Sequence, residues 1–244
     1  MPRGLPDYGI PQYSIATQSI DMATLMLAQT GICSIDGKGR IFHADNFHAG
    51  LSGFEPGSGG DGKNPYPATT HCYIPPLSMG MTPGTINGNG VAYAYKILTI
   101  PDTNKIGIEV MVGAGTSHPI IYDVMVLYGY KDLAGYKWEV KWNTNDGTIS
   151  INVGGSFINI GTYYPNASFW IWTAIKLVGN ISTGKYDRLL VGNVGYNLSG
   201  YNAYNVSVPT KGLFEMWLQC WPALTYQTGD YGRYGYVIVT VDEP

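Results

Sequence analysis

Pairs of carboxylates are the residues most able to do chemistry in a sheet protein, because most glycosidases cleave their substrate with two acids that flank the scissile bond. The chain has five glutamates: Glu55, Glu109, Glu139, Glu215 and Glu243. None of them has a second carboxylate two or four positions away on its own predicted strand. Glu139 instead shares its side of a strand with Lys137 and Lys141, which favours a surface ion pair over a general acid. The sequence therefore predicts that the protein is not an enzyme, and a glycosidase with acids from separate strands is a remote alternative.

The best candidate for a metal cluster is the group His43, Asp45 and His48. On a strand, His43 and Asp45 share one side whereas His48 points to the other, so a three-ligand zinc site requires a bend in the chain. Histidines with ordinary hydrogen bonds explain the group without a metal. We therefore predict that these residues bind no metal.

Calcium is a second option for a metal, in the loop that contains Asn143, Asn145 and Asp146, because side-chain and backbone oxygens suit this ion. The loop has few acids, however, and a hairpin turn explains its composition. We also find no Gly-x-Ser-x-Gly elbow and no glycine-rich phosphate loop between a strand and a helix. We therefore expect no cofactor, with calcium at this loop as the weaker alternative.

Exposed aromatic rings are the remaining candidates. Trp217 and Trp221 are predicted to share one side of a strand with Glu215 and Gln219, and a loop rich in Tyr, Asp and Arg follows. Rings beside short polar groups suit either a sugar or a protein interface. A third option is that the Trp side meets the other sheet. The candidate contact residues are Trp217, Trp221, Tyr226, Asp230, Tyr231, Arg233 and Tyr234.

The elements that must position these residues are strands. Residues 136–142 alternate Tyr, Trp, Val and Trp with Lys, Glu and Lys, which is the period of two of a half-buried strand. Similar alternation predicts core-facing rows at residues 91, 93, 95 and 97, at 106, 108, 110 and 112, at 120–128, at 149–153 and at 237–241. With no sign of alternating strands and helices, the predicted fold is all-β, an antiparallel two-sheet jelly-roll sandwich.

An extended arm and one short helix are predicted before this sandwich. Residues 1–18 contain three prolines, and Ser19 fits the N-cap of a helix that ends near Gly31. The domains predicted are thus residues 1–31, the arm and helix, and residues 32–244, a single β-sandwich. The candidate arm contacts are Leu5, Tyr8, Ile10 and Tyr13.

Composition excludes some functions. Charged residues make up 13% of the chain, the net charge is -3, and no basic cluster exists, so we predict no nucleic-acid partner. No apolar stretch is long enough to span a membrane, and no secretory leader is visible. Cys33, Cys72 and Cys220 are widely spaced, which favours buried thiols, with one disulfide as the alternative.

Residues 42–54, FHADNFHAGLSGF, resemble the first strand of concanavalin A-like (laminin-G-like) jelly-roll domains, which often contain Asp-x-Phe-Glu-x-Gly-Leu-x-x-Trp. His48 stands at the Glu of that pattern and Phe54 at its Trp. Residues 172–197 resemble the paired back strands of the same fold. The arm and helix resemble those of structural proteins encoded in bacteriophage and prophage genomes.

Together these features predict a non-catalytic structural protein of a virion, either a capsid-decorating or a tail-associated subunit. Its partners would be copies of itself and a shell protein of the particle. The alternative is a lectin-like module that binds glycans through exposed Trp and Tyr, located outside the cell or at its surface.

Overall fold

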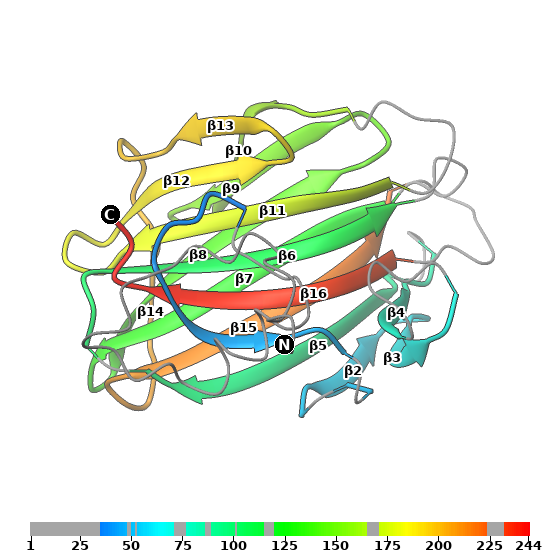
Figure 1. Ribbon diagram of the computed structural model, residues 1–244, viewed down its shortest axis with the longest axis horizontal. Coiled ribbons are helices and arrows are strands. Elements are labelled where there is room, and N and C mark those ends of the chain that lie inside the picture. Colours follow the sequence, from blue (N-terminus) through cyan, green and yellow to red (C-terminus); the bar gives the residue numbers. More distant parts are fainter. Residues whose placement is uncertain are drawn as a thin grey trace, which may run out of the picture.

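The computed structural model describes residues 35–47, 50–51, 53–70, 77–85, 89–100, 102–114, 120–164, 171–223 and 232–244. Within them, sixteen strands form two antiparallel sheets that pack face to face, here called sheet A and sheet B (Figure 1). The predicted all-β sandwich is confirmed. The predicted arm, with Leu5, Tyr8, Ile10 and Tyr13, and the predicted helix lie outside the described residues.

The strand that comes last in the sequence lies near the middle of sheet A. Its order is β13 (Val194–Asn197), β12 (Lys185–Val191), β11 (Ile171–Asn180), β6 (Lys105–Ala114), β16 (Gly232–Val241), β4 (Ser78–Thr82) and β3 (Lys63–Ala68). β1 (Arg40–Asp45) pairs with the other end of β16, beside β4. The segment that resembles the back strands of concanavalin A-like domains therefore forms β11, β12 and β13, which are neighbours as expected.

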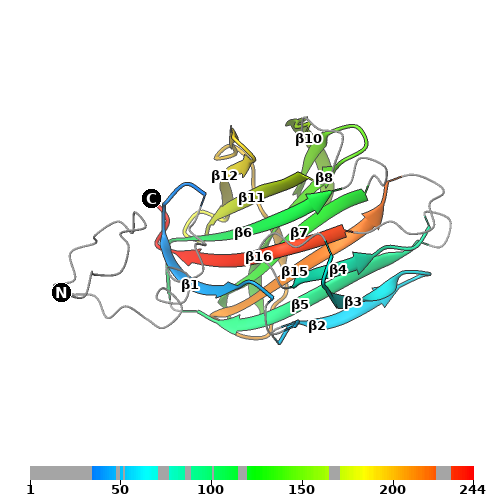
Figure 2. The same cartoon turned by 45° about the vertical axis from the view of Figure 1, so that its right-hand side comes forward.

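Sheet B forms the second layer, which Figure 2 shows behind sheet A. Its order is β10 (Ser156–Thr162), β9 (Thr148–Val153), β8 (Ala134–Asn143), β7 (Ile120–Lys131), β15 (Leu213–Pro222), β5 (Val91–Thr99) and β2 (Glu55–Gly59). β14 (Tyr204–Val206) pairs with β8. None of the residues described forms a helix with the length and apolar character of a membrane span.

The inner faces of the two sheets share one hydrophobic core. On β6, β7 and β15 the buried side chains alternate as predicted, and none is more than 3% exposed: Ile106, Ile108, Val110, Val112, Ile120, Tyr122, Val124, Val126, Tyr128, Phe214, Met216, Leu218 and Cys220. Buried rings have partners for their polar atoms. Trp138 Nε1 donates to the Lys185 carbonyl at 2.9 Å, and Trp142 Nε1 donates to the Tyr163 carbonyl at 3.1 Å.

The prediction for β5 is wrong, because this strand is turned over. Ala92 and Ala94 face the core with 0% exposure, whereas Tyr93 and Tyr95 lie half-buried on the outer face and Ile97 is 52% exposed. Residues opposite each other on paired strands point to the same face. Tyr95 lies opposite Trp217 of β15, which faces outward, so pairing between the strands sets the orientation of β5.

Candidate functional site

Four aromatic side chains on the outer face of sheet B form the candidate site, which we call the aromatic face: Tyr93 and Tyr95 of β5, and Trp217 and Trp221 of β15. The ring centroids of Tyr95 and Trp217 are 4.7 Å apart and their planes differ by 19°, a stacked arrangement. Tyr93 lies 5.2 Å from Trp217 at 40°. Three rings therefore make one continuous and partly exposed apolar surface.

Hydrogen bonds hold both tryptophans of the aromatic face in place. Trp217 Nε1 donates to Glu215 Oε1 at 2.8 Å, and Trp221 Nε1 donates to Gln219 Oε1 at 3.2 Å. Glu215, Trp217, Gln219 and Trp221 all point outward from β15, as the alternation predicted. The option that the Trp side of this strand meets the other sheet is therefore wrong. A carboxylate has two oxygens that accept hydrogen bonds, so Glu215 can bind a further donor beside the ring.

The two tyrosines are fixed by β2. Tyr95 Oη donates to Glu55 Oε2, and this bond raises the pKa of Tyr95. A Cβ atom at Gly57 would lie 2.4 Å from Cε2 of the Tyr93 ring, so the ring covers the glycine closely. The edge strand β2 therefore supplies the acid Glu55, which binds Tyr95, and the glycine Gly57, against which the Tyr93 ring packs.

Two carboxylates meet beside the aromatic face, on the neighbouring strands β7 and β8. Asp123 and Glu139 are diagonal neighbours, since Asp123 lies opposite Lys141 and Glu139 lies opposite Met125. Their exposed fractions are 1% and 5%. Burial and then the charge of Glu139 raise the pKa of Asp123 to about 7, against the lowering effect of Lys141.

Each member of this pair has a cation. Lys137 Nζ lies 2.8 Å from Glu139 Oε2, so the predicted ion pair is present, but Glu139 is buried and not at the surface as predicted. Lys141 Nζ lies 3.4 Å from Asp123 Oδ2. Asn152 Nδ2 also donates to Glu139 Oε2 at 2.6 Å. A catalytic acid must reach its substrate. Both carboxylates are nearly inaccessible, and each is paired with a lysine.

The search along single strands missed this pair, because its members come from two strands. A hairpin centred at Asp132 and Leu133 would by itself place residue 123 opposite residue 142. The irregularity between Gly129 and Lys131 shifts the register by one, so residue 123 lies opposite residue 141, and the turn sequence alone does not reveal this pairing. Lys141 Nζ also lies 4.1 Å from the ring centroid of Phe157 and 5.4 Å from that of Trp221.

Two predicted contact residues are not at the surface. Arg233 is 4% exposed and Tyr234 is 0% exposed, so their prediction as exposed contacts is wrong. Both belong to β16, which has neighbours on each side within sheet A and is buried on both faces. Arg233 lies over the ring of Tyr66, and Tyr234 Oη donates to the Gln219 carbonyl at 2.9 Å. Tyr226, Asp230 and Tyr231 lie outside the described residues.

The candidate metal ligands have structural roles. Asn143 Oδ1 accepts from the Asn145 amide at 3.0 Å, and Asp146 Oδ1 accepts from the Thr148 amide at 2.9 Å, so these side chains stabilise the turn. Calcium at this turn stays a prediction. In the part of the chain that the structure describes, no three His, Cys, Asp or Glu side chains gather as metal ligands would.

The histidine of the proposed cluster lies beside a cation. Lys96 Nζ lies 3.7 Å from Asp45 Oδ2, and burial and then the charge of Lys96 lower the pKa of His43 to about 4. His43 is therefore neutral at pH 7. His48, the third residue of the candidate metal cluster, lies outside the described residues. Of the three cysteines, Cys220 is a buried free thiol, and Cys33 and Cys72 also lie outside the described residues.

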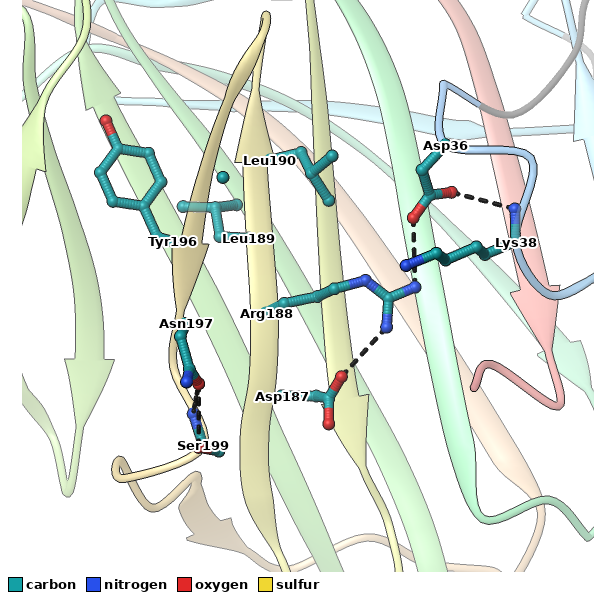
Figure 3. Close-up of a pocket in the computed structure, with 10 residues that line it drawn as sticks. Asp36, Lys38, Asp187, Arg188, Leu189, Leu190, Tyr196, Asn197 and Ser199 are labelled. Atoms are coloured by element: carbon teal, nitrogen blue, oxygen red, sulfur yellow. Dashed lines mark hydrogen bonds and ion pairs between the residues drawn. The ribbon is translucent and has the colours of Figure 1, made fainter.

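A polar groove of about 520 Å³ lies on the outer face of sheet A, beside β12 and β13 (Figure 3). Asp36 and Arg188 line it, and they belong to an ion cluster that we define as Asp36, Lys176, Arg188 and Glu243. Lys176 Nζ lies 2.5 Å from Asp36 Oδ1 and 2.9 Å from Glu243 Oε1, and its side chain is fully buried. Arg188 Nη2 lies 3.1 Å from Asp36 Oδ2 and 2.5 Å from Glu243 Oε2.

The charges of the ion cluster neutralise one another. Burial alone would raise the pKa of Asp36, but hydrogen bonds and the charge of Lys176 outweigh it and lower the pKa to about 2. The cluster joins the turn before β1 to β11, β12 and the residues after β16. It therefore stabilises the fold, and the aromatic face is the better candidate for ligand binding.

Comparison with known proteins supports the fold. No protein-family model matches the sequence, and no curated protein matches it. Among solved structures, the globular domain of T. cruzi calreticulin has a TM-score of 0.51 at 8% identity, covering 83% of this chain and 89% of that one. A sialidase has a TM-score of 0.49 at 10% identity, and the match covers 86% of this chain but 19% of that chain. A lectin from Bauhinia forficata, in complex with GalNAc, has a TM-score of 0.46 at 12% identity, covering 84% and 100%.

These likenesses concern the fold alone, because the identities are low. The two-layered antiparallel sandwich is shared with the globular domain of T. cruzi calreticulin, and it is the fold that the resemblance of residues 42–54 predicted. Phe42 and Asp45 of that segment lie on β1, at the expected first strand.

Proposed function

We propose that the protein binds glycans through the aromatic face. The observation that carries this proposal is the stack of Tyr95 and Trp217, with Tyr93 against it, on a face where the rings are partly exposed. Flat apolar rings can pack against the C–H groups of a sugar ring, and ligand sites commonly combine such rings with a few fixed polar groups. The lectin among the structural neighbours agrees with this proposal only at the level of fold.

The polar groups beside the rings favour a neutral, hydroxyl-rich ligand. Glu215, Gln219 and Glu55 each use a side-chain oxygen to fix a ring, which sets the position of these acceptors. Sugar hydroxyls can donate to the oxygens that stay available. Since the rings and their acceptors are held in place before binding, little conformational entropy is lost when the ligand arrives.

A glycan array followed by isothermal titration would test the proposal. The wild-type protein should bind at least one neutral glycan, and Trp217→Ala should weaken that binding about tenfold or more, which corresponds to about 1.4 kcal/mol. Gly57→Ala should also weaken it, because the added Cβ displaces the Tyr93 ring. Tyr201→Ala is the matched control, since this tyrosine is 36% exposed and lies on the loop between β13 and β14.

Two results would count against the proposal. One is that no glycan on the array binds to the wild-type protein. The other is that Trp217→Ala binds as tightly as the wild type while its unfolding midpoint is unchanged. Either result would leave the aromatic face without a role in carbohydrate binding.

The second candidate is the structural subunit of a virus particle. Low charge favours it, since 13% of the residues are charged and neutral polar surfaces suit contact between protein copies. If the arm joins subunits, deleting residues 1–18 should lower the mass of the native assembly and leave the circular dichroism of the sandwich unchanged. An unchanged native mass would rule out assembly through the arm.

A further inference from the structure

One lateral edge of the sandwich has no charged side chain. It consists of β10 of sheet B and β13 of sheet A, both at the top of Figure 1, and we call these two strands the uncharged edge. Residues 147–175 and 189–210, which contain both strands, include no Asp, Glu, Lys, Arg or His. Of the eight exposed large hydrophobic side chains among the described residues, five belong to these two segments: Phe157, Tyr164, Val194, Tyr201 and Tyr204.

The two strands of the uncharged edge contact each other. Tyr196 Oη of β13 donates to the Thr162 carbonyl of β10 at 3.2 Å. The Tyr196 ring also packs over Gly161, where an added Cβ would lie 2.7 Å from Cε1 of the ring. Sheets A and B are thus in contact at this edge.

The opposite edge of the sandwich is protected against strand pairing. β2 carries Glu55 and Pro56, and β3 carries Lys63, Pro65 and Pro67. Proline has no N–H group to donate, and charged residues on an edge strand disfavour pairing with another chain. The uncharged edge contains neither proline nor charge, so it lacks the protection that the β2 and β3 edge has.

The backbone of β10 is oriented for pairing. The turn at Gly154 and Gly155 joins β9 to β10, and both glycines have positive φ, as in a two-residue hairpin. Ser156 and Ile158 then bond to β9, so Phe157 and Asn159 direct their N–H and C=O groups away from it. Within the described residues, no strand pairs with this outer side of β10.

We propose that the uncharged edge is a self-pairing surface, at which β10 pairs antiparallel with β10 of a second copy of this chain. A two-fold axis at Ile158 would place Phe157 opposite Asn159 of the second copy, and this arrangement forms about four backbone hydrogen bonds. Because neither strand carries a charged side chain, the paired strands meet without repulsion between their own residues; the nearby cation Lys141 belongs to β8 and lies over Phe157. The pairing would also bury Ile158 and Phe157, which is 40% exposed in one copy. The inference does not depend on glycan binding.

Native mass spectrometry and sedimentation equilibrium of the full chain would test this pairing. The wild type should show a two-copy species whose fraction rises with protein concentration. Asn159→Lys places like charges near the two-fold axis and should raise the dissociation constant about 100-fold. Ser58→Lys adds the same charge to exposed β2 and should leave the constant unchanged.

Hydrogen exchange provides a measurement that needs no variant. The amides of Phe157 and Asn159 should be protected at concentrations where the two-copy species dominates and unprotected after dilution. A wild type that stays a single copy at about 100 μM, or a two-copy species in which both amides exchange freely, would overturn the proposal. A single copy that pairs only with a different protein would overturn it too.

Discussion

Replacing Asp123 with asparagine should stabilise the protein at alkaline pH and leave it almost unchanged at acidic pH. In the folded protein the pKa of Asp123 is about 7, against an ordinary value of 3.8. The folded state therefore holds a proton that the unfolded chain has lost, and stability falls as the pH rises from about 4 to 7. At about 1.36 kcal/mol per pKa unit, the full effect is about 4 kcal/mol above pH 7.

Asparagine removes this penalty, since it is nearly isosteric and carries no charge. It also removes the ion pair with Lys141 at 3.4 Å, which offsets part of the gain. We therefore expect the variant to be more stable than the wild type by about 2–4 kcal/mol at pH 8 and to differ by less than about 1 kcal/mol at pH 4.

Urea unfolding at several pH values between 4 and 8 would measure the difference between the two proteins. Asp102→Asn is the control, because this carboxylate is 76% exposed in a surface pair with Lys211 and should matter by less than about 1 kcal/mol at any pH. A difference between Asp123→Asn and the wild type that does not vary with pH would refute the reasoning. It would mean that Asp123 is ionised throughout the range.

Three further changes test other parts of the fold. Lys176→Met removes the buried cation shared by Asp36 and Glu243, and urea unfolding should show a free energy of unfolding lower by about 3–5 kcal/mol. Lys211→Met, at an exposed ion pair, should change this free energy by less than about 1 kcal/mol. Gly179→Ala places a Cβ 2.4 Å from Cε2 of Trp138 and should destabilise the protein by about 1–3 kcal/mol. Tryptophan fluorescence in denaturant would measure this change. At Gly195 an added Cβ meets no atom within 4 Å, so Gly195→Ala should have little effect. The pKa of Asp36 is lowered to about 2, so its ionised form stabilises the protein above about pH 4, and this contribution is lost as the pH falls through 2. Thermal unfolding between pH 2 and 5 should therefore show a smaller drop in unfolding temperature for Asp36→Asn than for the wild type.

The fold could be predicted where large apolar residues alternate with polar ones. On β6, Ile106, Ile108, Val110 and Val112 alternate with Gly107, Glu109 and Met111, so the β-branched residues on one side determine the orientation of the strand. On β5 the alternation is between aromatic residues and alanine, and both sides are apolar. The rings of Tyr93 and Tyr95 then follow Trp217 on the neighbouring strand, a contact between residues more than 120 positions apart that no local pattern contains.

The candidate site could be predicted only in part, for the same reason. Trp217 and Trp221 were found because their own strand alternates clearly. Asp123 and Glu139 were missed because their proximity depends on the register of β7 and β8. Arg233 was predicted to be exposed because the sequence resembles a polar loop there, whereas its strand lies in the middle of a sheet, where its long side chain packs over Tyr66.

The strand order has a consequence for synthesis of the chain on the ribosome. β15 lies between β7 and β5, and β16 lies between β6 and β4, so each sheet receives a central strand from the last strands in sequence. Until these residues have left the ribosome, β5, β6 and β7 present long unpaired edges and uncovered apolar faces. Such edges can pair with other chains. A growing chain is therefore open to mispairing until β15 and β16 have been made, and premature termination before β15 should give aggregates instead of a smaller folded protein.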